Sequence, residues 1–421
     1  MTLNHSCRRL ACAIAVGTLL VAFTGRIANA QDIYQKDLGD LFSDTDSASA
    51  AEPELHKLYL PLLPIIGYAP ANGFMIGAGI AGSILLDSSE HTRISSALAN
   101  ILFTSKHQIN LNLRHNVYLS HDTWIFQGDW RLLFFTQPTY GLGIQDYPAV
   151  FSLNGISLED EAGAQPMKFN YLRVYETVFR RLNKRLYAGG GISIDYHYKI
   201  EDQLLDLSMD PPLLTSHYLY SLYKDFPTEH YSTIGFTGKL LYDNRDNAIN
   251  AYNGTYIDFG FRINKDFLGS TKNSSQVIIE ARKYQRVGTG KNLFAFWLIG
   301  DIKLSGSIPY LALPSIGWDT YNRSGRGYLQ GRFRGENMIY AETEFRYKIS
   351  QSGLLGGVLF LNTITTDNEL IDQKIFDAFA FGYGAGLRIK MNKETRTNIC
   401  VDIGLGQNNS SGVYFGIQEA F

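Results

Sequence analysis

The sequence predicts an all-β fold, a transmembrane antiparallel β-barrel of 16 strands. Apolar and polar residues alternate with a period of two in many short segments, which is the pattern of strands with two different faces. Beyond the N-terminal leader, no apolar run reaches the ~18 residues that a membrane-spanning helix needs. Tyr, Phe and Gly number 26, 25 and 40. This composition is typical of barrels in the outer membrane of Gram-negative cells, and we expect the chain there.

The first 30 residues have the features of a secretory signal peptide. Arg8 and Arg9 form the charged region, residues 11–23 are apolar, and Ala28 and Ala30 flank Asn29 in a small-x-small cleavage motif. We therefore expect residues 1–30 to be removed.

The remaining chain is mildly acidic, because the leader carries three arginines and no acid and leaves 35 basic against 40 acidic residues, a net charge of −5. No basic patch or RNA motif appears, so nucleic acid is not an expected partner. Cys7 and Cys12 leave with the leader, and Cys400 then has no partner for an intramolecular disulfide. We expect neither a metal nor a cofactor.

Residues 31–56 are polar and acidic without a strand period, and we interpret them as a short periplasmic tail. The barrel is expected at residues 57–421. Its predicted strands lie at about 58–68, 73–86, 92–104, 107–119, 122–136, 168–181, 185–198, 230–242, 254–264, 275–286, 292–305, 336–348, 353–363, 378–390, 396–407 and 412–421.

The predicted twelfth strand shows why the two faces indicate lipid and water. Successive residues of this strand point to opposite faces. One face is mostly apolar and consists of Ile339, Ala341, Thr343, Phe345 and Tyr347. The other face carries four charges in a row and consists of Tyr340, Glu342, Glu344, Arg346 and Lys348. The second face is too ionic for a packed interior. We therefore assign lipid to the first face and an aqueous lumen to the second.

Connection lengths test this assignment independently. The long connections, at residues 137–167, 199–229, 306–335 and 364–377, follow the fifth, seventh, eleventh and thirteenth strands. All four strands are odd-numbered, so these connections emerge on one side, as the long surface loops of such barrels do.

The C-terminus ends on Phe421, with Phe415 and Ile417 on the same face of the predicted last strand. A terminal aromatic residue resembles the signal that the barrel insertion machinery reads, and we expect that machinery as a partner during biogenesis. Glu419 departs from the pattern, because its position is usually apolar. The alternative is a last strand that ends in Phe without such a role.

The loop before the predicted twelfth strand contains Arg326, Gly327 and Tyr328. This segment resembles the Val/Ile-Arg-Gly-Phe/Tyr motif in the sixth surface loop of the bacterial surface antigen superfamily, which includes the BamA and TamA assembly barrels and the two-partner secretion transporters. The resemblance continues at residues 331–347, 240–256, 305–317 and 64–79. Two positions depart from the family: Gly325 replaces Val or Ile, and Asn362 replaces the aspartate of a Phe-x-Asp motif.

The resemblance implies that the sixth loop folds into the lumen and is held there by Arg326. An arginine held away from bulk water needs a charged or hydrogen-bonding partner. Glu342 and Glu344 are the first candidates, Asp402 is the next, and Asn362 occupies the family's aspartate position. The alternative is an external loop with a solvated arginine.

Three glycines, Gly382, Gly384 and Gly386, recur with a period of two on the predicted fourteenth strand and share the parity of Arg388 and Lys390. They therefore face the lumen. Three missing side chains would give the backbone of the folded loop room to lie against the wall.

The turn between the eighth and ninth strands contains Asp243, Arg245, Asp246 and Gly254. Its carboxylates could suggest a cation site. The family places an acidic-Arg-Asp turn at this periplasmic position, and the resemblance implies a structural role.

Pro61 and Pro64 lie in the predicted first strand, and neither can donate a ladder hydrogen bond. The boundary between the first and last strands is therefore expected to be weakly bonded. In the assembly barrels this boundary is the lateral gate for client strands. The alternative is a strand that begins after Pro64, with a normal boundary.

The sequence contains none of the enzyme motifs G-x-S-x-G, H-E-x-x-H and G-x-x-x-x-G-K-[ST], and we do not expect an enzyme. The resemblance implies a short form without POTRA repeats that acts in protein or lipid translocation or insertion, with outer-membrane lipids and a periplasmic protein as partners. Two alternatives stay open: a small-solute channel closed by the sixth loop, and a surface antigen without transport.

Overall fold

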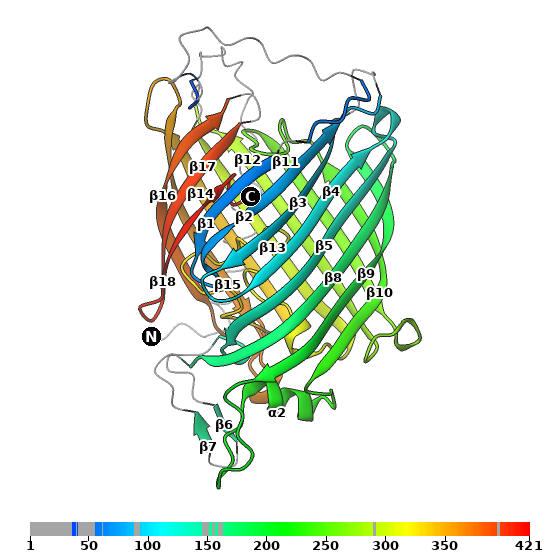
Figure 1. Ribbon diagram of the computed structural model, residues 1–421, viewed down its shortest axis with the longest axis vertical. Helices are drawn as coiled ribbons and strands as arrows, with labels where there is room; N and C mark the ends of the chain where they lie inside the picture. The colour runs from blue at the N-terminus through cyan, green and yellow to red at the C-terminus, as the bar shows by residue number, and fades with distance from the viewer. Residues whose placement is uncertain are drawn as a thin grey trace, which may run out of the picture.

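The computed structural model describes residues 36–38, 40, 55–60, 62–87, 93–144, 151–153, 156–158, 163–288, 292–393 and 396–421. The predicted signal peptide, Pro61 and most of the predicted tail lie outside these residues. Sixteen antiparallel strands form one closed barrel, in which β1 lies between β2 and β18 (Figure 1).

The barrel strands correspond one to one with the predicted strands, with ends that differ by a few residues. They are β1 (Leu62–Ala69), β2 (Gly73–Ile84), β3 (Ser95–Thr104), β4 (Ile109–Tyr118), β5 (Trp124–Thr139), β8 (Gln165–Arg181), β9 (Leu186–Asp202), β10 (His230–Asp243), β11 (Gly254–Asn264), β12 (Ser274–Arg286), β13 (Leu293–Gly306), β14 (Asn337–Lys348), β15 (Leu355–Thr366), β16 (Ala380–Asn392), β17 (Thr397–Gly406) and β18 (Ser411–Ile417).

Each strand has one face toward the lumen and one toward the outside of the barrel. In β14 the buried positions include Tyr340, Glu342 and Glu344, whereas the residues between them are half-buried. On β2 the outward side chains Phe74 and Ile76 are 70% and 65% exposed, as expected for residues that contact lipid. The barrel therefore carries its charge inside and its apolar surface outside.

The two ends of the barrel differ in their connections. Long connections at residues 140–164, 203–229, 307–336 and 367–379 join the strands at one end, which we call the loop end. There α2 (Ser216–Tyr223) and the hairpin β6 (Phe151–Leu153) and β7 (Ile156–Leu158) extend beyond the barrel (Figure 1). Shorter connections form the other end, which we call the turn end.

Short helices occupy several connections: η2 (Ser120–Asp122), η3 (Asp266–Leu268), η4 (Tyr310–Ala312) and η5 (Glu369–Ile371). Of the helices in the described residues, none is long and apolar enough to span a bilayer.

The described part of the predicted tail contacts the turn end. The Lys36 amide donates to the Ser352 carbonyl at 3.1 Å, and the Leu38 amide donates to the Lys390 carbonyl at 3.0 Å. The Asp37 carboxylate accepts a hydrogen bond from the Lys393 amide at 3.1 Å. This segment of the tail is thus held against the turns of β14–β15 and β16–β17.

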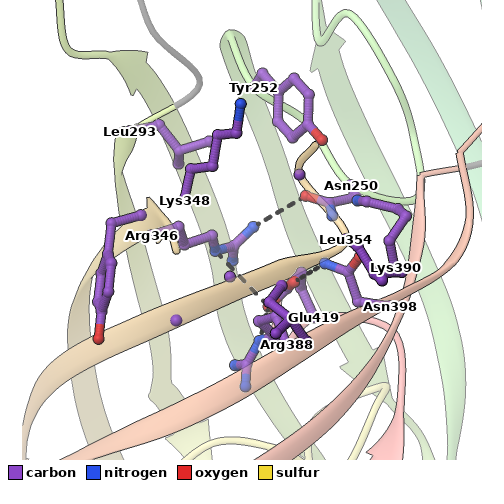
Figure 2. A pocket seen from close by; sticks show the side chains of 15 residues that line it. Asn250, Tyr252, Leu293, Arg346, Lys348, Leu354, Arg388, Lys390, Asn398 and Glu419 are labelled. Carbon is purple, nitrogen blue, oxygen red and sulfur yellow. Dashed lines mark hydrogen bonds and ion pairs between the residues drawn. The ribbon is translucent and has the colours of Figure 1, made fainter. Parts of the chain in front are cut away.

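The last strand is shorter than predicted. β18 ends at Ile417, and Gln418 adopts a φ of 76°, which turns the chain away from the barrel wall. Glu419 accepts hydrogen bonds from Arg388 at 2.7 Å and from Asn398 at 2.5 Å (Figure 2). The prediction that Phe421 shares the face of Phe415 and Ile417 is therefore wrong. A carboxylate such as Glu419 costs free energy against lipid, and the turn places it beside lumen arginines instead.

Candidate functional site

The sixth loop, residues 307–336 between β13 and β14, contains the predicted arginine motif. Gly325 and Gly327 both have left-handed φ angles, 81° and 104°, which residues with side chains rarely adopt. The two glycines let the backbone turn sharply on either side of Arg326. This turn directs the arginine side chain into the barrel, where it is 3% exposed.

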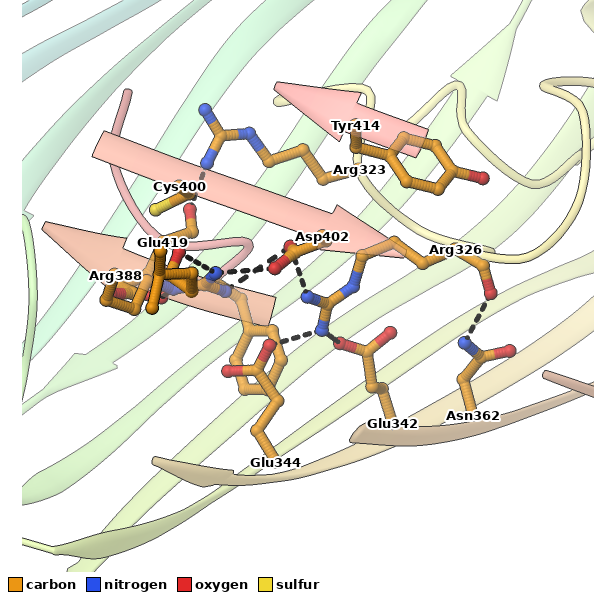
Figure 3. A network of polar contacts seen from close by, with 12 residues as sticks. Arg323, Arg326, Glu342, Glu344, Asn362, Arg388, Cys400, Asp402, Tyr414 and Glu419 are labelled. Atoms are coloured by element: carbon orange, nitrogen blue, oxygen red, sulfur yellow. Dashed lines mark hydrogen bonds and ion pairs between the residues drawn. The ribbon is translucent and has the colours of Figure 1, made fainter. Parts of the chain in front are cut away.

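Three carboxylates surround the Arg326 guanidinium (Figure 3). Nη1 lies 2.8 Å from Oδ2 of Asp402 on β17, and Nη2 donates to Oε1 of both Glu342 and Glu344 on β14. The guanidinium carbon also lies 3.8 Å from the centre of the Phe360 ring on β15. Strands β14, β15 and β17 therefore contact one loop side chain.

Two further arginines complete the ion network. Arg346 Nε lies 2.6 Å from Glu344, and Arg388 Nη1 lies 2.5 Å from Asp402. The network consists of three guanidinium groups and four carboxylates: Arg326, Arg346 and Arg388 with Glu342, Glu344, Asp402 and Glu419. Charges of opposite sign nearly balance, which buried ions require.

Glu342 depends on Arg326 more than the other carboxylates do. Glu344 and Asp402 each contact a second arginine, whereas Arg326 is the cation paired with Glu342 among the described residues. The other bond to Glu342 comes from the Tyr340 hydroxyl. Removal of Arg326 would therefore leave Glu342 buried without a counter-ion.

The loop backbone is bonded to the wall beside this network. Asn362 Nδ2 donates to the Arg326 carbonyl at 2.9 Å, so the position at which the family has an aspartate binds the loop backbone instead of the guanidinium. The Gly327 amide donates to the Tyr414 hydroxyl at 3.0 Å, and the Tyr328 hydroxyl donates to the Phe381 carbonyl at 2.5 Å.

The same loop contacts the opposite wall of the barrel. The Trp318 ring packs edge-on against Phe135 of β5 and Tyr171 of β8, with centroid distances of 5.7 Å in both cases. Arg131 of β5 donates to Asn322 Oδ1 at 2.9 Å. The sixth loop thus crosses the lumen from β5 and β8 to β14–β18.

The predicted glycines make room for different neighbours. A Cβ on Gly382 would lie 2.7 Å from the Arg326 carbonyl, so this glycine gives space to the loop backbone. A side chain on Gly384 would collide with the Phe360 ring, and one on Gly386 would collide with the Asp402 carboxylate. These two glycines accommodate the side chains that surround the arginine.

Two glycines on β17 also accommodate the loop, and the sequence prediction missed them. A Cβ on Gly404 would lie 2.5 Å from the Gly327 nitrogen, and one on Gly406 would lie 2.6 Å from the Tyr328 ring. They repeat with the same period of two as Gly382 and Gly384 on the neighbouring strand. That repeat was a signal in the sequence that could have identified them.

The C-terminal segment, residues 418–421, lies in the lumen next to the loop. Arg323 of the loop donates to the carbonyls of Ile417 and Gln418, in both cases at 2.7 Å. The Phe421 ring is 5% exposed and stacks on Trp297 at 5.1 Å. The terminal aromatic that we interpreted as an insertion signal is therefore buried in the folded barrel.

The turn of residues 244–253 is internally bonded. Arg245 Nε lies 2.9 Å from Asp243, and one Asp246 oxygen accepts from the Tyr252 amide at 2.9 Å. Gly254 has a φ of 118°, and a Cβ there would lie 2.6 Å from the Arg245 backbone. Asp246 is also bonded to Arg396 of the β16–β17 turn at 2.9 Å, so the carboxylates are engaged by groups of the protein.

Few residues of β1 and β18 are paired across the boundary between these two strands. Among the described residues, the two strands are matched at Tyr68 and Phe415, whereas β17 and β18 are matched at seven positions and β1 and β2 at eight. Pro64 lies within β1, opposite Ala78 of β2, and lacks the N–H that a ladder needs.

Comparisons with known proteins agree with this architecture. The Omp85 superfamily domain matches residues 207–421. A search of curated proteins finds no match. BamA from Haemophilus ducreyi lacking POTRA domains 1–3 is similar in structure, with a TM-score of 0.56 and 12% identity over 99% of this chain and 82% of that chain.

Two CdiB structures are also similar. The Escherichia coli protein gives a TM-score of 0.55 at 10% identity over 87% of this chain, and the Acinetobacter baumannii protein gives 0.51 at 10% identity over 86%. This chain spans 63% and 65% of the respective CdiB chains. Identities this low show a shared fold. Since the Omp85 domain covers more than half of the sequence, this chain belongs to the Omp85 superfamily and is a β-barrel of the Gram-negative outer membrane.

Proposed function

We propose that this barrel inserts or translocates protein or lipid at the outer membrane, and that its substrate passes along the boundary between β1 and β18. The observation that carries the proposal is the contrast between a lumen crossed by a bonded loop and a wall that is weakly paired at one place. Passage through the centre would require the Arg326 network to break. Passage at the boundary would require the loss of few backbone contacts.

The energetic difference between the two routes supports this choice. Withdrawal of the loop would separate the Arg326 guanidinium from three carboxylates and break the hydrogen bonds that Asn362, Gly327 and Tyr328 make between the loop and the wall. The net contribution of one backbone hydrogen bond to stability is about 0.5–1.5 kcal/mol. Among the described residues the boundary matched at Tyr68 and Phe415 is the most weakly paired part of the wall, and we infer that it separates most easily.

The partners of this function follow from the same geometry. Outer-membrane lipids would contact the boundary from outside. A periplasmic protein would approach at the turn end, where the described tail segment Lys36–Leu38 is bonded to the turns.

A disulfide across the boundary tests the proposal. Tyr68 and Phe415 are directly opposed, and opposed residues of antiparallel strands have Cα atoms about 4.5–5.5 Å apart, within the range of a disulfide. We would combine Tyr68→Cys and Phe415→Cys with Cys400→Ala, oxidise the cells and compare outer-membrane protein and lipid composition with that of a deletion strain.

We expect the oxidised variant to resemble the deletion strain and the reduced variant to resemble wild type. The matched control joins Tyr383→Cys and Leu405→Cys, an opposed pair between β16 and β17, and should have no effect. Full complementation by the oxidised boundary variant would exclude this route.

A further inference from the structure

A small pocket opens at the turn end of the lumen, beside the C-terminal segment (Figure 2). Its volume is about 70 Å³, which is room for more than one water molecule. Four basic side chains and one acidic side chain line it: Arg346, Lys348, Arg388, Lys390 and Glu419.

The acid is already neutralised. Glu419 accepts from Arg388 at 2.7 Å, and Arg346 is bonded to Glu344 at 2.6 Å. Burial alone would raise the pKa of Glu419, but Arg388 and Arg346 hold it well below its usual range. The two arginines and their carboxylates therefore form closed pairs, and the two lysines remain.

Lys390 is 5% exposed, and its ammonium group has no carboxylate partner among the described residues. Lys348 is half-buried and likewise has no such partner in that part of the chain. Of the tail acids that the structure describes, Asp37 and Asp40 both contact Lys393. The two lysines thus line the pocket without a carboxylate partner from the described residues, and their charge favours an anion there.

We propose that this pocket binds a phosphate group, with Lys348 and Lys390 as its charge partners. A phosphate or phosphate monoester carries about −1.5 to −2 charges at pH 7, which matches two unpaired ammonium groups. A carboxylate would neutralise one of them.

The phosphate has two sources that fit the same chemistry: free phosphate, and the headgroup of a phosphomonoester lipid at the rim of the barrel. The proposal does not depend on the route through the β1–β18 boundary. Failure of one proposal would leave the other standing.

Calorimetric titration tests the site. The full-length mature protein in a neutral, phosphate-free detergent would be titrated with sodium phosphate at constant ionic strength, and sodium chloride would serve as the reference salt. We expect one saturable phosphate site. Lys390→Gln and Lys348→Gln should each weaken binding at least tenfold, because each removes one of the two unpaired charges.

Lys184→Gln is the matched control, because Lys184 is an exposed lysine in the β8–β9 turn at the same end of the barrel and outside the pocket. It should bind phosphate as wild type does. Heat-modifiable mobility in gels verifies folding, and Lys348→Gln, at the half-buried position, serves if Lys390→Gln does not fold.

Competition by phosphatidic acid in neutral micelles separates the two sources. Displacement of phosphate by this lipid assigns the pocket to a headgroup, and undisturbed phosphate binding assigns it to the free anion. Absence of saturable binding to the wild-type protein, or unchanged binding by Lys390→Gln, would overturn the proposal.

Discussion

Replacement of Arg326 by alanine should release the sixth loop from the wall while leaving the barrel folded. The substitution removes the guanidinium that contacts Asp402, Glu342 and Glu344, of which Glu342 has no other cation among the described residues. The strand ladders do not involve this side chain. The effect should therefore be local to the loop.

The magnitude follows from the buried charge that remains. Removing one partner of a buried pair costs about 3–5 kcal/mol, because the other partner stays desolvated. A cost of about 3 kcal/mol corresponds to about a 100-fold larger population of the open loop, since each 1.4 kcal/mol is tenfold. The hydrogen bonds of the Gly327 amide and the Tyr328 hydroxyl to the wall limit the effect to local opening rather than complete detachment.

Hydrogen exchange measured by mass spectrometry is the appropriate assay. Peptides that cover residues 317–333 should lose about 100-fold of their protection in Arg326→Ala, whereas peptides of β8 and β9 should keep theirs. Arg332→Ala is the control, because Arg332 lies in the same loop and stacks on Tyr140 at 4.6 Å without contacting the three carboxylates. Equal protection in Arg326→Ala and wild type would refute the role of the ion network.

A double substitution sharpens this test. Glu342→Gln removes the carboxylate that Arg326→Ala leaves unpaired, so the double variant should regain part of the lost protection. A coupling of about 1–3 kcal/mol is expected for residues in one network. Strict additivity of the two single effects would show that the pair is not coupled.

Three further predictions follow from the same structure. Gly404→Ala places a Cβ 2.5 Å from the loop backbone and should destabilise the closed loop by about 1–3 kcal/mol, measured as lost hydrogen-exchange protection of the loop. Gly300→Ala is the control and should be neutral, because nothing lies within 4 Å of a Cβ at that position. Equal effects of the two substitutions would contradict the packing argument. The Phe421 side chain is 5% exposed in the lumen, and Phe421→Ala should lower the free energy of unfolding, measured in guanidinium, by about 3–5 kcal/mol. An unchanged midpoint of the guanidinium unfolding curve would argue against burial of this ring. The hydrogen bond from Lys224 holds the pKa of Glu369 below its usual range. This contact therefore stabilises α2 above the ordinary pKa of about 4.3 and is lost as pH falls through the lower folded value. Because the Glu369 side chain is 44% exposed, the effect should be below about 1 kcal/mol, and Glu369→Gln should abolish the difference in α2 protection between pH 7 and pH 3.

The strands could be predicted because membrane and lumen impose a strict period of two. In β14, for example, Glu342 and Glu344 could only face water or an ion partner, while Ile339 and Phe345 faced lipid. The long connections could be assigned to one end, because parity alone decides the end at which each strand finishes. The hairpin β6–β7 and helix α2 were not predicted, because the alternation criterion does not apply outside the membrane.

The direction of the last four residues could not be predicted from the period alone. Phe415, Ile417, Glu419 and Phe421 continue one parity, and the pattern favours a strand to the end. The positive φ of Gln418 breaks that strand. The signal for the break was Glu419, whose carboxylate would face lipid in the continued strand and lies beside Arg388 in the structure.

The choice among candidate partners for Arg326 also needed the structure. Sequence parity places Glu342, Glu344, Asn362 and Asp402 on lumen faces but gives no distances across the barrel. All four contact Arg326, and Asn362 does so through the backbone carbonyl rather than the guanidinium. This division of roles depends on how the loop crosses the lumen.

The most direct test of the account is the conductance of the purified wild-type protein in planar bilayers. A lumen crossed by the sixth loop and held at Arg326 predicts no steady conductance from wild type or Arg332→Ala, and frequent openings from Arg326→Ala. A continuous, porin-like conductance of the wild-type protein would show that the loop does not close the lumen, and would contradict the account.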